Sequence, residues 1–541
     1  MPKIEVNEEV FYALAGGKRW STKDEFEEAR TCAKAELDED SDKSLPVDER
    51  VLKIELNDTN RPDLWGTAGC ARQLKVYQDG RIPEYPFFSR PGNIKKCTHK
   101  VKVEKSVQKV RPFLTGFIAG GKTISDPALR DMIQTQEKLA WNFGRKRRSI
   151  SMGVYRIARI NWPIIYKGVD PDSVSFVPLQ WDSPLTLREI LKQHPKGKEY
   201  AFILEKEPVH PLLTDSKGEV LSYPPIINSN DLGAVQVGDT DIFVELTGTD
   251  IAQVTLAASI VACDLADNGF SIEPIKVKYE FDTLFGRNVI FPCYFQQPVF
   301  CSLARIEKFL GEKLSGDECV KALNRMGVKA EKSEGAERGQ PPEKSGEGVL
   351  AYPPEYRNDF LHAADVAEDV MIGRGLGSFK PERPGDPTVG RLSPITLFSR
   401  QVKEIFIGMG YQEMIYNYLG SRKDLVEKMR SAGDRIIRIA NPMTENYEYV
   451  RDSIIASLME SESVSGNSVY PHKIFEVGKV AYLDSADNSG TVTRQYAGFL
   501  HSDKEANFNT AAGQMQTLFY YLSREYEVEE SDDPRFIPGR A

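Results

Sequence analysis

Four acidic residues lie close together in the stretch PPEYRNDFLHAADVAEDV, residues 353–370. Asp359 precedes an expected helix. Asp365, Glu368 and Asp369 lie within that helix at positions i, i+3 and i+4, which places their carboxylates on one face, where like charges repel each other. A divalent cation would remove this repulsion, and oxygen ligands with open water positions suit Mg²⁺. An acidic helix face exposed to solvent is a common alternative, so the residues alone leave both interpretations open.

A second group of polar residues is expected at the ends and turns of strands. Its members are Ser222, Asn228, Glu245 and Thr247. The segment YPPIIN sets two prolines ahead of Asn228, which favours an extended backbone and a stiffly held amide. Ordinary turn chemistry produces the same pattern, so a pocket is one of two interpretations.

Several catalytic motifs are missing from the sequence. It has no G-x-x-x-x-G-K-[ST] phosphate loop, no H-E-x-x-H zinc motif and no G-x-S-x-G nucleophile elbow. The six histidines are dispersed along the chain. A histidine metal cluster or a histidine-based catalytic triad is therefore not expected.

The charge distribution allows local basic patches only. A formal net charge of −9 argues against a surface that binds nucleic acid as a whole. Two basic runs stand out: IKKCTHKVKVEKSVQKVR at residues 94–111, and Arg145, Lys146, Arg147 and Arg148 in FGRKRRS. Charge patterning alone favours a solvated surface for both runs.

Length and composition indicate a large globular protein. A chain of 541 residues corresponds to three or four domains at roughly 150 residues each. No apolar run reaches the roughly 18 residues of a membrane span, and IAQVTLAASIVACDLA from residue 251 is expected to be a buried helix. The N-terminus lacks a signal-peptide pattern, and the seven cysteines form no C-x-x-C pair. We therefore expect reduced thiols, a cytoplasmic location and no membrane association.

The order of elements predicts a multidomain α+β protein. The expected domains are an N-terminal α/β domain at 1–88, a mixed α+β domain at 111–276, a winged-helix-like domain at 302–383 and a last α+β domain at 384–541. KDEFEEARTCAKAEL, residues 23–37, has apolar residues at helical spacing and is expected to be a helix. Ser315 and Glu318 have the spacing of a helix capping box.

Long segments, in the same order along the chain, resemble the β-subunit family of phenylalanyl-tRNA synthetases of the archaeal and eukaryotic-like type. VLKIELNDTNRPDLWGTAGCARQLKVY resembles the N-terminal domain. WNFGRKRRSISMGVYRI and LTLREILKQHPKGKEYAFIL resemble the editing domain. PPEYRNDFLHAADVAEDVMIGRG resembles the metal-bearing segment, and RIANPMTENYEYVRDSIIASLMES resembles the class II synthetase-like core.

The resemblance implies one subunit of a phenylalanine–tRNA ligase, which uses ATP to attach phenylalanine to its tRNA and works as an (αβ)₂ heterotetramer. It places ATP and the synthetic site on the α subunit. The sequence agrees, because EYVRDSII contains no R-x-E and no G-x-G-x-G-x-x-R segment follows. The last domain is therefore expected to be a catalytically inactive scaffold. Family members continue beyond DDPRFIPGRA, so this domain is expected to be incomplete at its C-terminal end.

The chemistry that the resemblance assigns to this chain is the hydrolysis of mischarged Tyr-tRNA. A hydrophobic pocket rejects an added hydroxyl by only about a hundredfold, so a second site that binds the phenol is useful. By resemblance, Leu213, Ser222, Asn228 and Glu245 map to this editing pocket. Glu245 is expected to accept a hydrogen bond from the tyrosine hydroxyl. Ser222 and Asn228 are expected to position the ester or the attacking water.

The resemblance also favours a metal over a solvated face for the acidic cluster. It implies that a Mg²⁺ ion, shared with the α subunit, is bound by Asp359, Asp365, Glu368 and Asp369. Such a shared ion could be structural for the subunit interface rather than catalytic.

Two other functions are compatible with the residues. A standalone Mg²⁺-dependent phosphoryl-transfer enzyme would act without a partner, but the absence of a phosphate-binding loop argues against it. A non-catalytic tRNA-binding scaffold is allowed by the basic runs and the winged-helix-like domain. The scaffold hypothesis predicts that Ser222, Asn228 and Glu245 do not converge on a pocket.

Overall fold

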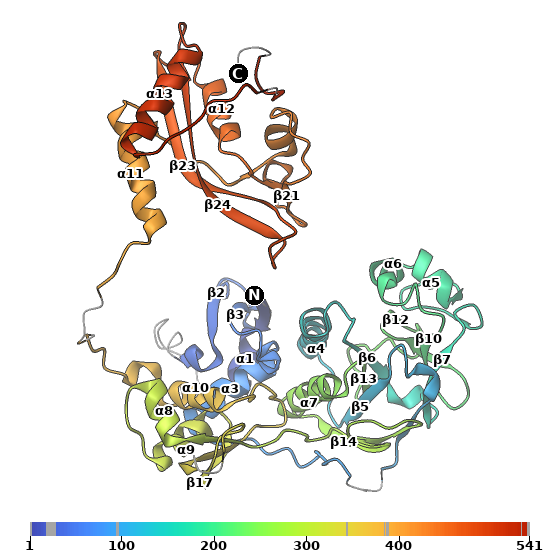
Figure 1. The fold of residues 1–541 in the computed structure, drawn as a ribbon. Coiled ribbons are helices and arrows are strands. Elements are labelled where there is room, and N and C mark those ends of the chain that lie inside the picture. The colour runs from blue at the N-terminus through green and yellow to red at the C-terminus, as the bar shows by residue number, and fades with distance from the viewer. Residues whose placement is uncertain are drawn as a thin grey trace. The chain divides into compact units, whose positions relative to one another are not determined.

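The computed structural model describes residues 3–17, 29–92, 97–341, 345–383, 385, 389–531 and 533–537. The chain divides into two compact units, Met1–Pro381 (unit 1) and Glu382–Ala541 (unit 2) (Figure 1). Both units combine helices with sheets. The predicted mixed α+β, multidomain class is therefore confirmed at this level.

The N-terminal part of unit 1 is a small sheet covered by helices. Its three strands have the order β1-β3-β2. The alternation in VLKIEL buries Leu52, Ile54 and Leu56 on one face of β3, against the helices. The elements are β1 (Lys3–Asn7), α1 (Glu8–Leu14), β2 (Ala35–Glu39), β3 (Val51–Leu56) and α3 (Thr67–Asp79).

The helix expected at residues 23–37 is wrong in its C-terminal part. A single 3₁₀ turn covers Thr31–Ala33, and strand β2 follows at once. Ala35 pairs with Leu56 of β3, so hydrogen bonding to a neighbouring strand overrides the helical spacing of the apolar residues. Residues 18–28, which include the start of this expected helix, lie outside the described residues.

A ten-stranded sheet forms the middle of unit 1. Its order is β12-β11-β10-β7-β4-β14-β5-β13-β6, with β15 paired to β14. Tyr155 on the last strand of this path hydrogen bonds to Ser222 near its other end, so the sheet curls back on itself. The strands are β4 (Lys100–Val103), β5 (Phe113–Gly120), β6 (Ile150–Arg156), β7 (Ile164–Val169), β10 (His210–Thr214), β11 (Val220–Tyr223), β12 (Ile227–Asn228), β13 (Ile242–Gly248), β14 (Ser271–Tyr279) and β15 (Asn288–Phe291).

Four helices accompany this sheet in the described residues: α4 (Asp126–Lys138), α5 (Leu187–Gln193), α6 (Pro195–Tyr200) and α7 (Ile251–Asp267). Helix α7 packs on β5, β13 and β14 and is buried along most of its length, as predicted. Thr255 and Ser259 satisfy their buried hydroxyls by donating to Ile251 O and Thr255 O. Among the described residues, no helix has the length and apolar character needed to cross a membrane.

The last part of unit 1 contains the segment expected to be winged-helix-like. A three-stranded sheet of order β16-β18-β17 packs with three helices. The predicted capping box is confirmed, because Ser315 accepts from the Glu318 amide and Glu318 accepts from the Ser315 amide. The elements are β16 (Val299–Ser302), α8 (Leu303–Leu310), α9 (Gly316–Arg325), β17 (Lys329–Gly335), β18 (Gly346–Tyr352) and α10 (Ala363–Arg374).

A buried arginine connects these parts of unit 1. Arg72 of α3 lies 3.1 Å from Asp264 and 2.6 Å from Asp267, both on α7. Its guanidinium also lies 4.1 Å from the ring centroid of Tyr356, in the segment before α10. One side chain therefore contacts the N-terminal helices, the helix behind the large sheet and the last segment of the unit.

Unit 2 has a long hairpin, β23 (His472–Leu483) with β24 (Thr491–Ser502), extended by β19 (Gln412–Glu413). Arg451 and Glu476 form a buried bidentate ion pair at 2.7 and 2.8 Å. This arginine of EYVRDSII therefore has an internal partner. The other elements are α11 (Pro394–Gly408), β20 (Leu419–Gly420), β21 (Ile437–Arg438), β22 (Tyr449–Val450), α12 (Ile455–Val464) and α13 (Phe508–Tyr521).

Candidate functional site

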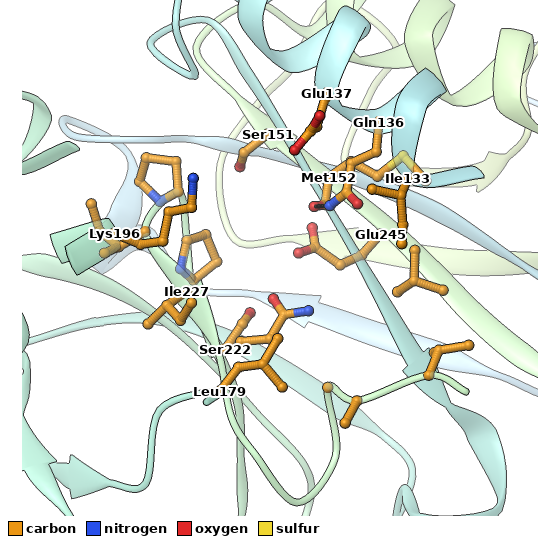
Figure 2. Close-up of a pocket in the computed structure, with 18 of the residues that line it drawn as sticks. Ile133, Gln136, Glu137, Ser151, Met152, Leu179, Lys196, Ser222, Ile227 and Glu245 are labelled. Atoms are coloured by element: carbon orange, nitrogen blue, oxygen red, sulfur yellow. Dashed lines mark hydrogen bonds between the residues drawn. The ribbon is translucent and has the colours of Figure 1, made fainter. Parts of the chain in front are cut away.

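A cavity of about 480 Å³ opens between α4, the β11–β12 hairpin and β13. Its volume lies in the range of roughly 300–1,000 Å³ that is typical of small-molecule sites. Figure 2 shows Glu245 extending into this space, with Ser222 on one side and the side chains of α4 on another. Residues that line the cavity include Ile133, Gln136, Glu137, Arg147, Ser151, Met152, Lys196, Ser222, Ile227, Asn228 and Glu245.

Three of the four residues assigned to the pocket by resemblance meet at one phenol. Tyr155 Oη lies 2.8 Å from Ser222 Oγ, 3.0 Å from Glu245 Oε1 and 3.4 Å from Asn228 Oδ1. A phenol has a single proton and cannot donate to all three acceptors. The longest contact is the weakest, so the Asn228 amide retains capacity for another partner.

Glu245 has an unused acceptor. The side chain is buried, and its Oε2 has no hydrogen-bond partner among the described residues. Burial raises the pKa of Glu245 to about 7, although the Tyr155 hydroxyl and the Arg111 guanidinium oppose the shift. A buried polar atom without a partner is costly, so a ligand that donates a hydrogen bond to Oε2 would recover that free energy.

The shifted pKa predicts a pH-dependent stability. The native state holds the Glu245 proton more tightly than the unfolded chain, whose pKa is 4.5, so stability present below pH 4.5 is lost as the pH rises through about 7. The expected loss is at most about 3 kcal/mol of unfolding free energy. Urea unfolding at pH 5 and pH 8 would measure it, and Glu245→Gln should reduce the difference. An identical pH dependence in wild type and variant would contradict this prediction.

A glycine beside Glu245 leaves space for the hydrogen bond between Tyr155 and Glu245. Gly153 of β6 pairs with Glu245 of β13. A Cβ atom at Gly153 would lie 2.2 Å from Tyr155 Oη and 2.7 Å from Glu245 Oε1. Any larger residue would therefore displace the Tyr155 hydroxyl and the Glu245 carboxylate.

Leu213 does not line the cavity. It pairs with Ser222 in the β10–β11 register, but its side chain is fully buried in a hydrophobic cluster. It supports the strand that carries Ser222. The two prolines before Asn228 also differ from expectation, because they lie in the turn between β11 and β12 rather than in an extended segment.

Tyr155 is the residue that sequence reasoning missed. Tyr155 lies in SMGVYRI, a stretch that resembles the family as a whole but to which the resemblance assigns no individual site residue. The strand that contains it is buried on both faces, so no alternation marks Tyr155 as special. A tyrosine in a buried strand needs a hydrogen-bond partner for its hydroxyl, and this requirement could have indicated a polar group beside Tyr155.

Each of the four residues of the acidic cluster already has a partner within the chain, and two of them share one arginine. Arg357 binds Asp359 and Asp369, each at 2.6 Å. Asp365 accepts from the backbone amides of Leu361 and His362, both at 2.7 Å, at the start of α10. Glu368 lies 2.7 Å from Lys34 Nζ.

The arrangement around Arg357 does not present a preformed cation site. Burial alone would raise the pKa of Asp359, but the Arg357 guanidinium holds it at about 2. Burial raises the pKa of Asp369, yet its 2.6 Å contact with the same guanidinium indicates an ionised pair. No group of three or more His, Cys, Asp or Glu side chains in the described part of the chain is placed to bind a metal. A Mg²⁺ ion bound by all four residues would require these ion pairs to be exchanged.

Comparison with known proteins gives consistent matches along the chain. The family described as "Phenylalanyl tRNA synthetase beta chain CLM domain" matches residues 381–541, and "tRNA synthetase B5 domain" matches residues 299–376. The phenylalanine–tRNA ligase beta subunit of Borrelia duttonii is 45% identical over 540 residues, covering 100% of this chain and 92% of that protein. The corresponding subunit of Treponema pallidum subsp. pallidum is 42% identical over 579 residues, covering 100% and 93%.

A solved structure supports the same relationship. The crystal structure of an N-terminal fragment of the phenylalanyl-tRNA synthetase β-subunit from Pyrococcus horikoshii is 33% identical, with a TM-score of 0.59. The match covers 69% of this chain and 99% of the fragment.

Proposed function

The chain belongs to the family of phenylalanine–tRNA ligase β subunits, and we propose that it hydrolyses Tyr-tRNA in the cavity around Glu245 while an α subunit charges phenylalanine. The partner would be α in an (αβ)₂ heterotetramer, with ATP bound by α. Six cysteines, Cys32, Cys70, Cys263, Cys293, Cys301 and Cys319, are buried free thiols. They suit a reducing compartment, and we place the protein in the cytoplasm.

The observation that carries this proposal is the unpartnered Glu245 Oε2 at the bottom of a cavity of suitable size. A tyrosine hydroxyl donates one hydrogen bond and would satisfy that oxygen. Phenylalanine would leave it buried and unpaired. A site that is built to bind a hydroxyl rejects the analogue without it by about 10⁴–10⁵.

We base the roles of Ser222 and Asn228 on their contacts with Tyr155. Ser222 shares the Tyr155 phenol with Glu245, so we assign Ser222 to orienting the residue that reads the tyrosine hydroxyl. The only side-chain hydrogen bond of Asn228 among the described residues is the 3.4 Å contact of its Oδ1 with Tyr155, so we assign its amide to the ester or the attacking water. In the reaction, water adds to the ester carbonyl, the bond to the ribose oxygen breaks, and that oxygen takes up a proton. Positioning can supply much of such a rate.

The test is a deacylation assay with the purified chain, with and without a co-expressed α subunit. Phenylalanine tRNA charged with tyrosine or with phenylalanine would be followed over time. Selective loss of the tyrosyl ester supports the proposal. Stable Tyr-tRNA in the presence of α, while Phe-tRNA is still synthesised, would leave this chain as a non-catalytic tRNA-binding scaffold.

Mg²⁺ is proposed only for the complex with α, because the four acids do not form a cation site in this chain. Asp365 and Glu368 are the two carboxylates with exposed side-chain area, at 30% and 44%. Asp365→Asn and Glu368→Gln are expected to weaken Mg²⁺ binding by at least roughly tenfold in calorimetric titration of the αβ complex. Glu347→Gln, an exposed acid outside the cluster, is the control. Unchanged affinity in both cluster variants would withdraw the metal.

A further inference from the structure

Two cations line the Glu245 cavity and lie near one aromatic ring. Arg147 and Lys196 both line it, and Figure 2 shows Lys196 on the opposite side from Ile133. The Arg147 guanidinium lies 4.3 Å and Lys196 Nζ 5.7 Å from the ring centroid of Tyr200. Arg147 also donates to the carbonyl oxygens of Pro225 and Ile226 in the β11–β12 turn. The basic run therefore reaches the cavity through Arg147.

Exposed aromatic side chains accompany the neighbouring cations of the same run. Trp141 and Phe202 have 46% and 40% of their surface exposed. Lys146 Nζ lies 5.2 Å from the Trp141 ring centroid, and the Arg148 guanidinium lies 4.9 Å from that of Phe202. Single exposed apolar side chains are common on protein surfaces, so the relevant feature is that each of these two rings lies next to a cation. We call Trp141, Lys146, Arg148 and Phe202 the aromatic–cation platform.

The backbone of the basic run is held in an uncommon conformation. Arg145, Lys146 and Arg147 have φ values of 51°, 55° and 65°. Three consecutive residues other than glycine in the left-handed region cost roughly 1–2 kcal/mol each, so the fold must stabilise this turn. A π-helical turn, Leu139–Phe143, leads directly into it and carries Trp141. π-helical turns often occur at functional sites.

A buried arginine holds the turn in place. Arg111 is 1% exposed and donates to the carbonyl oxygens of Arg147 and Arg148 at 3.2 and 2.9 Å. Its other hydrogen bonds join Ser151 and Thr247, on the two strands that flank this region. The Arg111 guanidinium therefore fixes the backbone of Arg147 and Arg148 in the basic run.

We infer that the aromatic–cation platform binds the unpaired 3′ end of an aminoacylated RNA and directs its terminal ester into the cavity. This inference rests on the proposed function, because Glu245 takes the phenol and the ester must then face the rim. Single-stranded nucleic acids bind to grooves that combine cations for phosphates with aromatic rings for bases. Each pair of the platform sets a cation beside an aromatic ring, and Arg147, which stands between Lys146 and Arg148 in the chain, lines the cavity.

The experiment uses the complete chain without α, whose synthetic site would also hold the 3′ end, and measures the affinity for phenylalanine tRNA, either intact or with its unpaired 3′ nucleotides removed. Base stacking on an aromatic ring corresponds to about tenfold or more in affinity. Trimming should therefore weaken wild-type binding at least about tenfold. In Trp141→Ala/Phe202→Ala, trimming should change affinity less than about twofold, because the platform no longer contributes. Trp141→Phe/Phe202→Tyr should restore the effect.

Phe309→Ala provides a matched control, since Phe309 is 56% exposed on α8 away from the cavity. It should behave as wild type. A full effect of trimming in the alanine double variant would overturn the inference. Failure of the proposed function has a different result: wild-type protein would not hydrolyse Tyr-tRNA, yet trimming would still weaken binding only when the platform is intact.

Discussion

Replacing Glu245 with alanine is expected to remove the preference of this chain for Tyr-tRNA over Phe-tRNA. The reason is the unpartnered Oε2, which is the acceptor for the tyrosine hydroxyl in the proposed function. Discrimination based on a buried hydrogen-bonding group can reach about 10⁴, so the ratio of kcat/KM for the two esters should fall at least about a hundredfold. Deacylation of both esters under single-turnover conditions would measure it.

Two variants sharpen this prediction. Glu245→Gln keeps the shape and one oxygen but removes the charge, so it should retain part of the preference. Glu334→Ala removes an exposed carboxylate on β17, outside the cavity, and should leave both rates unchanged. Normal Tyr-tRNA hydrolysis with Phe-tRNA still spared in Glu245→Ala would contradict the assignment of Glu245 to the phenol.

Local patterns in the sequence predicted local structure well. The capping box at Ser315, the alternation in VLKIEL and the apolar run from residue 251 each depend on residues within a few positions of one another. The helix expected over residues 23–37 was wrong where β3 offered a strand edge. That edge comes from residues far along the chain, and spacing within one segment cannot reveal it.

In the candidate site, too, contacts between distant segments could not be predicted from local patterns. Resemblance brought Ser222, Asn228 and Glu245 together, and the structure places all three within 3.4 Å of one phenol. Tyr155 was missed because the curl of the sheet, which brings β6 to β11, has no local signature. The arrangement of the acidic cluster also could not be predicted from spacing within its helix. Arg357 stands in the same segment, but helical spacing alone does not tell that its guanidinium binds two of the four acids.

The largest effect on stability is expected at Arg72, where Arg72→Met should lower the free energy of unfolding of unit 1 by about 3–5 kcal/mol. The substitution keeps much of the side-chain volume but leaves Asp264 and Asp267 without their cation. Side chains of Arg72 and Asp264 are 4% and 9% exposed, so water cannot replace the lost partner at Asp264. Urea unfolding, together with hydrogen exchange of α7, would measure the change.

An exposed ion pair supplies the control for this prediction. Arg287 and Asp282 lie 2.7 Å apart, with side chains 57% and 82% exposed, so Arg287→Met should cost less than about 1 kcal/mol. If burial of unpaired charge causes the loss, then Arg72→Met combined with Asp264→Leu should recover part of it, because fewer uncompensated carboxylates remain. Equal losses in Arg72→Met and Arg287→Met would contradict this explanation.

The same variant connects stability with the site. Helix α7 packs on β13, the strand that carries Glu245, and Arg72 of α3 binds Asp264 and Asp267 of α7. Loosening α7 should therefore increase the motion of β13 and lower the rate of Tyr-tRNA hydrolysis while the phenol-binding atoms remain present. A selectivity ratio that is kept at a lower rate would distinguish this indirect effect from the loss of selectivity expected for Glu245→Ala.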